Sequence, residues 1–424
     1  MSVMGFVSGM RGVSGKRGAS GTSGGRMTLR GELGGAFADL GVLVPLEAAL
    51  IAINGLNPTT TFLGVGLAYI LAGRYFGIPM PVQPLKAFAA VAVASHASPE
   101  VIAAGALWMS LILGLLAATG LVDALAARTP VGVVRGIQLG LGLLLLKNGW
   151  EFVANKPFFI DGQRPTAALG GVSVPLGVPV AVAAGVLLVA LLRWPRLPST
   201  PVLLVFGGLA GAAVGPHAAP AGLALGPAPW AAHAPAVGDL LVALPLLVVP
   251  QLPLTLANSV IATSDAAAAY FGERARRATP RALSLSIALG NLWAGLAGGL
   301  PMCHGCGGLT AHYRLGARTP LATTIVGGVL VVVAVLFGAA ALQVRSVIPY
   351  AIYGVLLVYV GYEHLKLGWA VPDRAARGVA VLTAGAAMAF NGNLAVGAAA
   401  GLGLWAVAWV ARQLGVGPRL APQP

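Results

Sequence analysis

The chain of 424 residues is 57% hydrophobic and only 9% charged, and its mean hydropathy is +0.86. These values lie well outside those of soluble globular domains and predict an integral membrane protein without a sizeable soluble domain. The formal net charge of +14 comes from basic residues scattered singly between apolar runs. Because they form no patch, this distribution excludes a nucleic-acid-binding surface.

The chain begins with a basic Gly/Ser-rich tail, residues 1–28, and a second short tail covers 413–424. The basic residues of the first tail are Arg11, Lys16, Arg17 and Arg26, and it contains no acid. We predict that this tail is disordered. The same composition is typical of an organellar transit peptide, and a start at Met27 is a second alternative.

Apolar runs of about 20 residues recur along the rest of the chain, and this length predicts membrane-spanning helices. The first set consists of residues 31–53, 59–75, 79–95, 99–121, 131–147, 173–192 and 200–215. After an uncharged linker, the second set consists of residues 239–262, 281–299, 301–314, 320–342, 346–366, 377–391 and 393–411. We therefore predict an all-α polytopic fold of about 14 spans, arranged as a 7+7 inverted repeat.

The distribution of basic residues tests this layout, because an odd-numbered repeat inverts its second half relative to the first. With the N-terminus inside, 20 of the 26 Lys and Arg residues fall in inside loops or tails, and Lys86 and Arg135 lie within spans. The outside loops contain only Lys147, Lys156, Arg164 and Arg345. The positive-inside rule then predicts cytoplasmic termini, and a plasma or inner membrane is the expected location.

Two of the predicted spans are interrupted by proline near their start. The segment PMPVQPLKAFAAVAV begins at Pro79 and PMCHGCGGLTAHYR begins at Pro301, and each holds third place in its set. Each is typical of an extended stretch followed by a half-length helix. A helix that begins inside a membrane directs its unpaired N–H groups and the positive end of its dipole toward the midplane, where they favour an anion.

The first interrupted span contains Gln83 and Lys86, one turn apart. A charge at a bilayer centre costs about 2.5–3.5 kcal/mol, so we predict that Lys86 has a function, with Gln83 as a donor to the same ligand. The alternatives are a structural lysine that pairs with a buried acid or extends to the interface, and a glutamine that only caps its helix.

The second interrupted span contains Gly305, Gly307 and Gly308, which leave backbone amides uncovered at the helix start. Such a start forms an anion-binding nest or serves only for close packing. Two helix N-termini with about half a positive charge each, together with Lys86, sum to about +2. A tetrahedral dianion such as molybdate or sulfate would match this charge.

The same span contains Cys303, His304 and Cys306 in the motif CHGC, which resembles a redox or metal pair only superficially. A c-type haem site needs histidine after the second cysteine, where this chain has Gly307, and no second cysteine pair completes a zinc site. We predict neither a metal nor a cofactor, and we keep His304 and Cys306 as candidate ligand contacts.

The first span contains three acids, Glu32, Asp39 and Glu47. Glu32 is expected near the inner surface, where an acid at a helix N-terminus is commonplace. Asp39 is deeper, so we predict that it pairs with Lys86 or carries a coupled proton. Glu47 is the second candidate for this role and is expected nearer the outer side.

The eighth span contains a polar stripe within PQLPLTLANSVIAT, residues 250–263. Gln251, Thr255 and Asn258 lie close to one helical face. Either the stripe lines a binding site, with Gln251 and Asn258 as ligand contacts, or it bonds neighbouring helices, the commoner use of small polar residues in membranes.

With GELGGAFADLGVLVPL at the start of the first span, these three motifs resemble the molybdate transporter family related to the SulP sulfate permeases. The resemblance covers nearly all of residues 30–412. It implies a core domain of spans 1–4 and 8–11 that moves against a gate domain of spans 5–7 and 12–14, with substrate between spans 3 and 10. The core would comprise residues 29–128 and 239–345, and the gate residues 129–238 and 346–412.

Two features depart from the family pattern. The chain ends at Pro424 without the STAS domain of many sulfate permeases, as expected for the molybdate branch. Cys306 stands where the family pattern has a smaller alanine, so the detailed geometry of the site is expected to differ.

From these features we expect a secondary active importer of molybdate with elevator-like alternating access, and not an enzyme. We expect sulfate and tungstate to compete with molybdate, and a proton or a sodium ion to be the co-substrate. We expect the protein to form a homodimer in the lipid bilayer. The alternatives are a sulfate or other small-anion permease, a channel, a nucleobase carrier and an oxidoreductase that uses CHGC. A nucleobase site would more naturally use acids, and residues 250–263 and 301–312 contain none.

Overall fold

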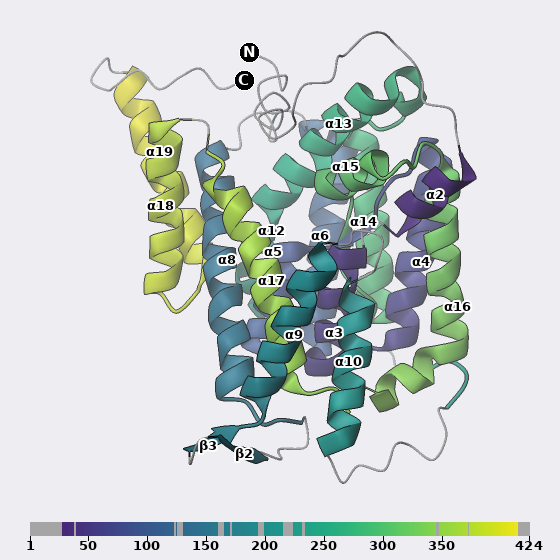
Figure 1. The fold of residues 1–424 in the computed structure, drawn as a ribbon. Helices are drawn as coiled ribbons and strands as arrows, with labels where there is room; N and C mark the ends of the chain where they lie inside the picture. Colours follow the sequence, from purple (N-terminus) through teal and green to yellow (C-terminus); the bar gives the residue numbers. More distant parts are fainter. Residues whose placement is uncertain are drawn as a thin grey trace, which may run out of the picture.

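A computed structural model of the chain describes residues 28–37, 40–122, 124, 130–159, 165–169, 172–193, 199–214, 224–230, 234–344, 347–371 and 373–413. This part of the chain is almost entirely helical, and most of its helices stand side by side in one bundle (Figure 1). Asp39, residues 1–27 and residues 414–424 lie outside the described residues.

The helices of the first half follow the predicted spans with a few shifts at their ends. They are α2 (Leu29–Ala36), α3 (Leu40–Asn54), α4 (Pro58–Phe76), α5 (Lys86–Ser95), α6 (Pro99–Thr119), α8 (Val131–Ala154), α9 (Gly177–Leu192) and α10 (Ser199–Val214). The strands are β1 (Gln83–Pro84) and the hairpin β2 (Thr166–Leu169) and β3 (Val172–Pro175). Helix α8 continues past the predicted end at residue 147 to Ala154, and Lys147 within it donates to Asn391 Oδ1 at 3.2 Å.

The second half begins with a long helical segment of mixed geometry. Its parts are α11 (Val237–Ala243), η2 (Leu244–Val248), α12 (Val249–Leu254), η3 (Thr255–Ile261), α13 (Ala262–Phe271) and η4 (Gly272–Ala275). The segments η2 and η3 are π-helical and flank Pro250 and Pro253. Proline lacks an N–H and its ring displaces the preceding turn, so a wider local helix is the physical consequence.

The remaining elements complete the bundle. They are α14 (Pro280–Ala297), β4 (Met302–Cys303), α15 (Cys306–Arg314), α16 (Pro320–Val344), α17 (Tyr350–Trp369), α18 (Arg374–Ala389) and α19 (Leu394–Gln413). Within the described residues, five helical stretches are long and apolar enough to cross a membrane: Pro99–Thr119, Val131–Ala154, Val237–Ala275, Pro320–Gln343 and Leu394–Ala411. These lengths and compositions fit the prediction of a polytopic membrane protein.

The prediction of one continuous first span at residues 31–53 is wrong, because α2 ends at Ala36 and α3 begins at Leu40. Helix α2 packs on the segment that follows α15: a Cβ added to Gly35 would lie 2.5 Å from Ala317 Cβ. Glu32 is fully buried there rather than at the surface, and its Oε1 accepts the Arg318 N–H at 2.9 Å.

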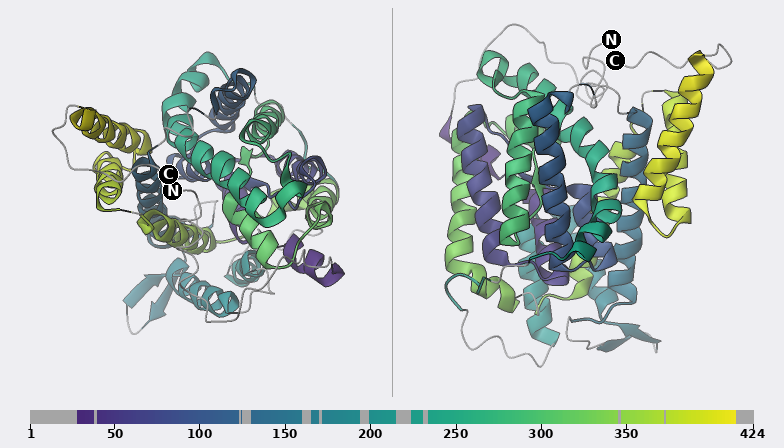
Figure 2. Two further views of the ribbon diagram at one scale, coloured as in Figure 1. Left: turned by 90° about the horizontal axis from the view of Figure 1, so that it is seen from above. Right: turned by 180° about the vertical axis from the view of Figure 1, so that it is seen from behind.

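The closest helix pairs join segments that lie far apart in the sequence. They are α8 with α17, α4 with α16, and α6 with α14 (Figure 2). Glycines bring two of these pairs into backbone contact: an added Cβ would lie 2.7 Å from Gly149 O if placed on Gly354 and 2.5 Å from Gly66 O if placed on Gly327. Small residues allow this approach in membranes, where packing rather than the hydrophobic effect holds helices together.

We expect Gly354→Ala to weaken the contact between α8 and α17. The new methyl group would meet the Gly149 carbonyl, and overpacking of this kind costs about 1–3 kcal/mol. Gly328→Ala in α16 is the matched control, since a Cβ there meets nothing within 4 Å. Thermal unfolding of the two purified variants in detergent would show a lower Tm for Gly354→Ala alone, and equal Tm values would contradict the observed packing.

Candidate functional site

The two proline-interrupted segments meet inside the bundle. Strands β1 and β4 pair antiparallel, with Gln83 opposite Cys303 and Pro84 opposite Met302. The Leu85 N–H extends the pairing to Pro301 O at 3.0 Å. Helix α5 begins directly after β1 and α15 begins three residues after β4, so both helices start next to each other in the interior.

The two half-helices lead away from this point toward opposite ends of the bundle. The end of α5 contacts Lys156, which follows α8, through His96. The end of α15 instead contacts α2, where His312 Nδ1 lies 2.6 Å from Gly35 O. In Figure 1, α2 and α15 lie at the end of the bundle opposite the β2–β3 hairpin. The predicted geometry of two helices that begin at mid-height is therefore present.

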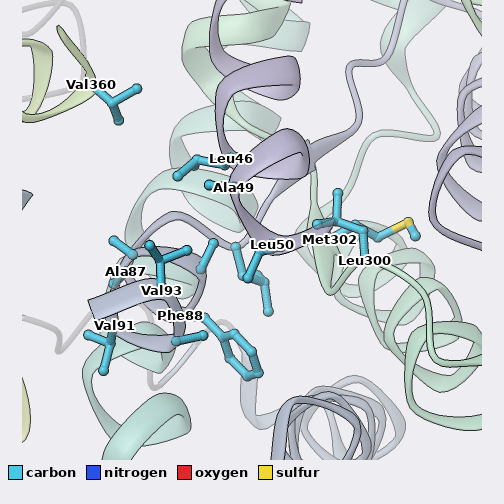
Figure 3. Close-up of a cluster of buried hydrophobic side chains, with 14 of the residues drawn as sticks. Leu46, Ala49, Leu50, Ala87, Phe88, Val91, Val93, Leu300, Met302 and Val360 are labelled. Carbon is cyan, nitrogen blue, oxygen red and sulfur yellow. The ribbon is translucent and has the colours of Figure 1, made fainter. Parts of the chain in front are cut away.

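Apart from Lys86, the first part of α5 is buried in an apolar cluster that fixes the helix in place. Figure 3 shows side chains of this cluster from several elements. They are Ala87, Phe88, Val91 and Val93 of α5, Leu46, Ala49 and Leu50 of α3, Val360 of α17, Met302 of β4, and Leu300 just before β4. All side chains from Ala87 to Val93 are buried and apolar, and Lys86 is the only cationic side chain within the helix α5.

Gln251 caps the first turn of α5 from the side. Its Oε1 accepts the Phe88 N–H at 3.0 Å, and its Nε2 donates to Thr255 Oγ1 at 2.8 Å. Gln251 is buried, and both ends of its amide have protein partners. The structure therefore gives Gln251 a positioning role, and a ligand contact of this residue stays a prediction.

His304 is also held by the protein. Its Nδ1 donates to Pro81 O at 2.8 Å, and its Nε2 lies 2.8 Å from Ser286 Oγ. Since a carbonyl can only accept, Nδ1 carries the proton and the neutral ring accepts from the serine hydroxyl at Nε2. Both ring nitrogens thus have protein partners, Pro81 O before β1 and Ser286 Oγ of α14, and a ligand contact of His304 stays a prediction.

Two further polar side chains position the start of α15, and the sequence analysis did not identify them. Asn291 Nδ2 donates to Met302 O at 2.7 Å, and Asn291 Oδ1 accepts the Met302 N–H at 3.3 Å. Thr263 Oγ1 donates to His304 O at 3.0 Å. The signal in the sequence that could have identified Asn291 was a side-chain amide in the middle of the predicted membrane span 281–299.

The glycines of the second segment leave open space at the start of α15. Gly307 is exposed, and a Cβ placed on it would meet nothing within 4 Å. The first N–H groups of a helix have no intrahelical partner, and no other described residue accepts from Cys306, Gly307 or Gly308. These three N–H groups form a set of donors at the start of α15 that no described residue uses.

Gly305 has a different task from Gly307. A Cβ placed on Gly305 would lie 1.9 Å from Gln83 Oε1, so the buried Gln83 side chain lies directly over this glycine. The close approach brings the Gln83 amide to the start of α15. Gln83 is therefore at the predicted position between the two half-helices.

Lys86 is half-buried at the first position of α5. Its Nζ makes no hydrogen bond or ion pair with any residue in the described part of the chain. Lys86 follows Leu85, whose N–H pairs with Pro301 O of the second interrupted segment. The structure thus brings together Lys86, Gln83 and the glycine-rich start of α15.

Glu47 lies beside the same site. Helices α3 and α5 run in the same direction, because Asn54 near the end of α3 donates to Ala92 O and Ala97 O near the end of α5. Two turns earlier, Glu47 shares the Asn54 face of α3, and α3 contacts both β1 and α5. Glu47 is fully buried, and neither carboxyl oxygen has a hydrogen-bond partner among the described residues.

Asn258 and the two cysteines complete the set of predicted residues. Asn258 is half-buried in η3, and its side-chain amide has no hydrogen bond to another described residue. Cys303 is buried with its Sγ 3.8 Å from Pro84 O, while Cys306 is half-buried, and the two cysteines form no disulfide with a described residue. No group of three or more His, Cys, Asp or Glu side chains in the described ranges could hold a metal ion.

Two interrupted helices that start face to face around an unpaired lysine define a class of membrane transporters. The fold is similar to the transmembrane domain of a cyanobacterium bicarbonate transporter, BicA, with a TM-score of 0.63 and 18% identity over 87% of this chain and 97% of that one. It is also similar to murine Slc26a9, an anion transporter, with a TM-score of 0.66 and 14% identity over 96% and 75%. The chain therefore has the membrane-transporter fold of these proteins.

Sequence comparison gives the family within this class. The family model described as "Molybdate transporter of MFS superfamily" matches residues 31–145 and 243–363. "Molybdate transporter 2" of Arabidopsis thaliana is 31% identical over 79% of this chain and 78% of its own, and "Molybdate transporter 1" of Chlamydomonas reinhardtii is 30% identical over 78% and 82%. The chain belongs to the molybdate transporter family.

Membership confirms the resemblance to the molybdate transporter family that the sequence motifs predicted. It also confirms that the protein is a transporter and not an enzyme. The oxidoreductase alternative is thereby removed.

We expect Gly305→Ala and Gly307→Ala to differ in stability although they lie in one turn. The first must displace the buried Gln83 side chain, whereas the second has room for its methyl group. Thermal unfolding in detergent would therefore show a lower Tm only for Gly305→Ala. If Gly307→Ala were the less stable of the two, the placement of Gln83 over Gly305 would be incorrect.

Proposed function

We propose that this protein is a secondary active transporter of molybdate that binds the dianion between the starts of α5 and α15. The observation that carries the proposal is Lys86, a half-buried ammonium group without an ion-pair partner in the described residues. Family membership and the names of the relatives support molybdate as the substrate.

The electrostatic balance supports a dianion. An unpaired cation inside a membrane costs about 2.5–3.5 kcal/mol by insertion scales, and a bound anion removes this cost. The two helix N-termini add about half a positive charge each, so the site presents about +2. Gln83 and the N–H groups of Cys306, Gly307 and Gly308 replace the water around the oxyanion. Sulfate and tungstate share its charge and shape and are the expected competitors.

Transport requires the site to open to each side in turn, and we infer an elevator-like movement of a core domain (29–128 and 239–345) against a gate domain (129–238 and 346–412). The helix pairs support an inverted repeat behind this division. In the predicted repeat, α4 corresponds to α14, α6 to α16, α8 to α17, and β1 to β4. Exchanging the two halves therefore turns the pair of α4 and α16 into the pair of α14 and α6. The pair of α8 and α17 and the pair of β1 and β4 remain the same pairs.

The orientation follows from charge. Basic residues gather at the end of the bundle where α15 and α17 end, among them Arg74, Arg274, Arg318 and Arg374. By the positive-inside rule this end faces the cytoplasm of a plasma or inner membrane, and both termini lie on that side.

Glu47 is the residue we propose for proton coupling. A buried carboxylate without a partner is costly, so the protonated form is favoured in the state that the structure describes. Asp39, the other predicted candidate, lies outside the described residues. A sodium ion is the alternative co-substrate, and the transport experiment below separates the two.

We expect Lys86→Gln to reduce uptake of labelled molybdate into proteoliposomes at least about tenfold, equivalent to about 1.4 kcal/mol of lost binding energy. Lys147→Gln is the control, because Lys147 contacts Asn391 on the outside of the bundle. Unchanged uptake by Lys86→Gln would refute the site. Excess unlabelled sulfate that competed as well as molybdate would identify a general oxyanion permease, and failure to accumulate molybdate uphill would identify a channel.

An inward proton gradient is expected to accelerate uptake by the wild type, because protonated Glu47 would move with the anion. In Glu47→Gln the side chain stays neutral, so uptake should continue without a response to the gradient. Glu151→Gln, at the end of α8, is the control and should respond like the wild type. Wild-type uptake that followed a sodium gradient and ignored pH would show that proton coupling is wrong.

A further inference from the structure

A separate apolar groove lies on the outside of the bundle, between α8, α17 and α18. Its volume is about 780 Å³. It is lined by Leu139 and Leu143 of α8, Leu365, Lys366, Trp369 and Ala370 of α17, and Val381, Ala384 and Gly385 of α18. None of these residues belongs to the proposed anion site, and α18 lies at one edge of the bundle in both views (Figures 1 and 2).

The groove opens toward the membrane. Leu143, Val381 and Trp369 are 40%, 51% and 63% exposed, although they are apolar and line its walls. A Cβ placed on Gly385 meets nothing within 4 Å, so no described part of this chain fills the space at that point. In a membrane protein such a surface contacts the hydrocarbon of the bilayer.

One end of the groove reaches the level of the lipid headgroups. Trp369 is the last residue of α17, and α18 begins a few residues later at Arg374. Tryptophan and lysine are enriched at this depth because each combines an apolar body with a polar tip. From there Leu365 and Gly385 carry the groove about one to three turns into the apolar layer.

Basic residues surround the mouth. Arg374 and Arg377 are exposed and share the Val381 and Ala384 face of α18 by their helical spacing. Neither forms an ion pair with a described residue. Lys366 is half-exposed and contacts Glu363 at 2.6 Å, so it remains open to an additional anionic group on its exposed side.

We propose that this groove binds one acyl chain of an anionic phospholipid, with the lipid phosphate at Lys366, Arg374 and Arg377. The apolar walls take the chain, and the basic mouth selects the headgroup charge. A second copy of the protein fits less well. A two-fold interface through this groove would bring the same basic residues of both copies together, which is unfavourable.

The test compares wild type with a variant in which the groove is filled. Gly385→Leu places a side chain in the groove, and Gly403→Leu is the control, since Gly403 of α19 is equally open but lies outside the groove. The full chain is purified in detergent, and Tm is measured with added phosphatidylglycerol or phosphatidylcholine. Mass spectrometry of the purified protein identifies retained lipid.

Phosphatidylglycerol should raise the Tm of the wild type and of Gly403→Leu by at least about 2 °C more than phosphatidylcholine does. Gly385→Leu should lose this difference and its retained lipid. Lys366→Gln combined with Arg374→Gln should lose the preference for phosphatidylglycerol while its Tm without lipid stays close to that of the wild type.

Two results would overturn the proposal. Gly385→Leu that retained phosphatidylglycerol like the wild type would show that the lipid binds elsewhere. A change of oligomeric state in Gly385→Leu, without any change in lipid retention, would show that the groove belongs to an interface between copies.

Discussion

The constraint on which this fold depends is that backbone N–H and C=O groups inside a membrane have no water to bind. Two interrupted segments expose such groups at mid-height, and the β1–β4 pairing together with Gln251 satisfies most of them. The N–H groups of Cys306, Gly307 and Gly308 at the start of α15 have no acceptor among the described residues. In the proposed binding mode these unpaired N–H groups donate to the anion. The surrounding side chains then need only to leave these groups without another acceptor.

That task explains why polar residues occur in otherwise apolar helices. Asn291, Thr263 and His304 bond to the extended backbone of the two segments, so they compensate carbonyl and N–H groups that a continuous helix would have paired internally. Each of these side chains is buried and hydrogen-bonded, which removes the cost of its own burial. Asn291, Thr263 and His304 thus position the start of α15 without accepting hydrogen bonds from its first N–H groups.

The sequence carried most of the architecture because its signals are local. Apolar run length, proline and glycine predict where helices begin, and the pairing of two prolines in equivalent positions predicted that α5 and α15 start together. The roles of Gln251 and His304 could not be predicted in the same way, since their partners Phe88 and Pro81 lie far away in the sequence and only the fold brings them near. The packing of Gly35 on Ala317 is likewise a contact between distant parts of the sequence that only the fold reveals.

The packing also explains why the proposed movement can occur without loss of the site. The glycine contacts that bring backbones together lie within the proposed core, between α4 and α16, and within the proposed gate, between α8 and α17. Such contacts interlock, so they hold each part rigid. Where the two parts meet near the site, Val360 of α17 shares an apolar cluster with Leu46 and Ala87 of the core (Figure 3). Apolar side chains have no directional bonds to break, so such a contact fits the proposed movement, in which Lys86 and the start of α15 both belong to the proposed core.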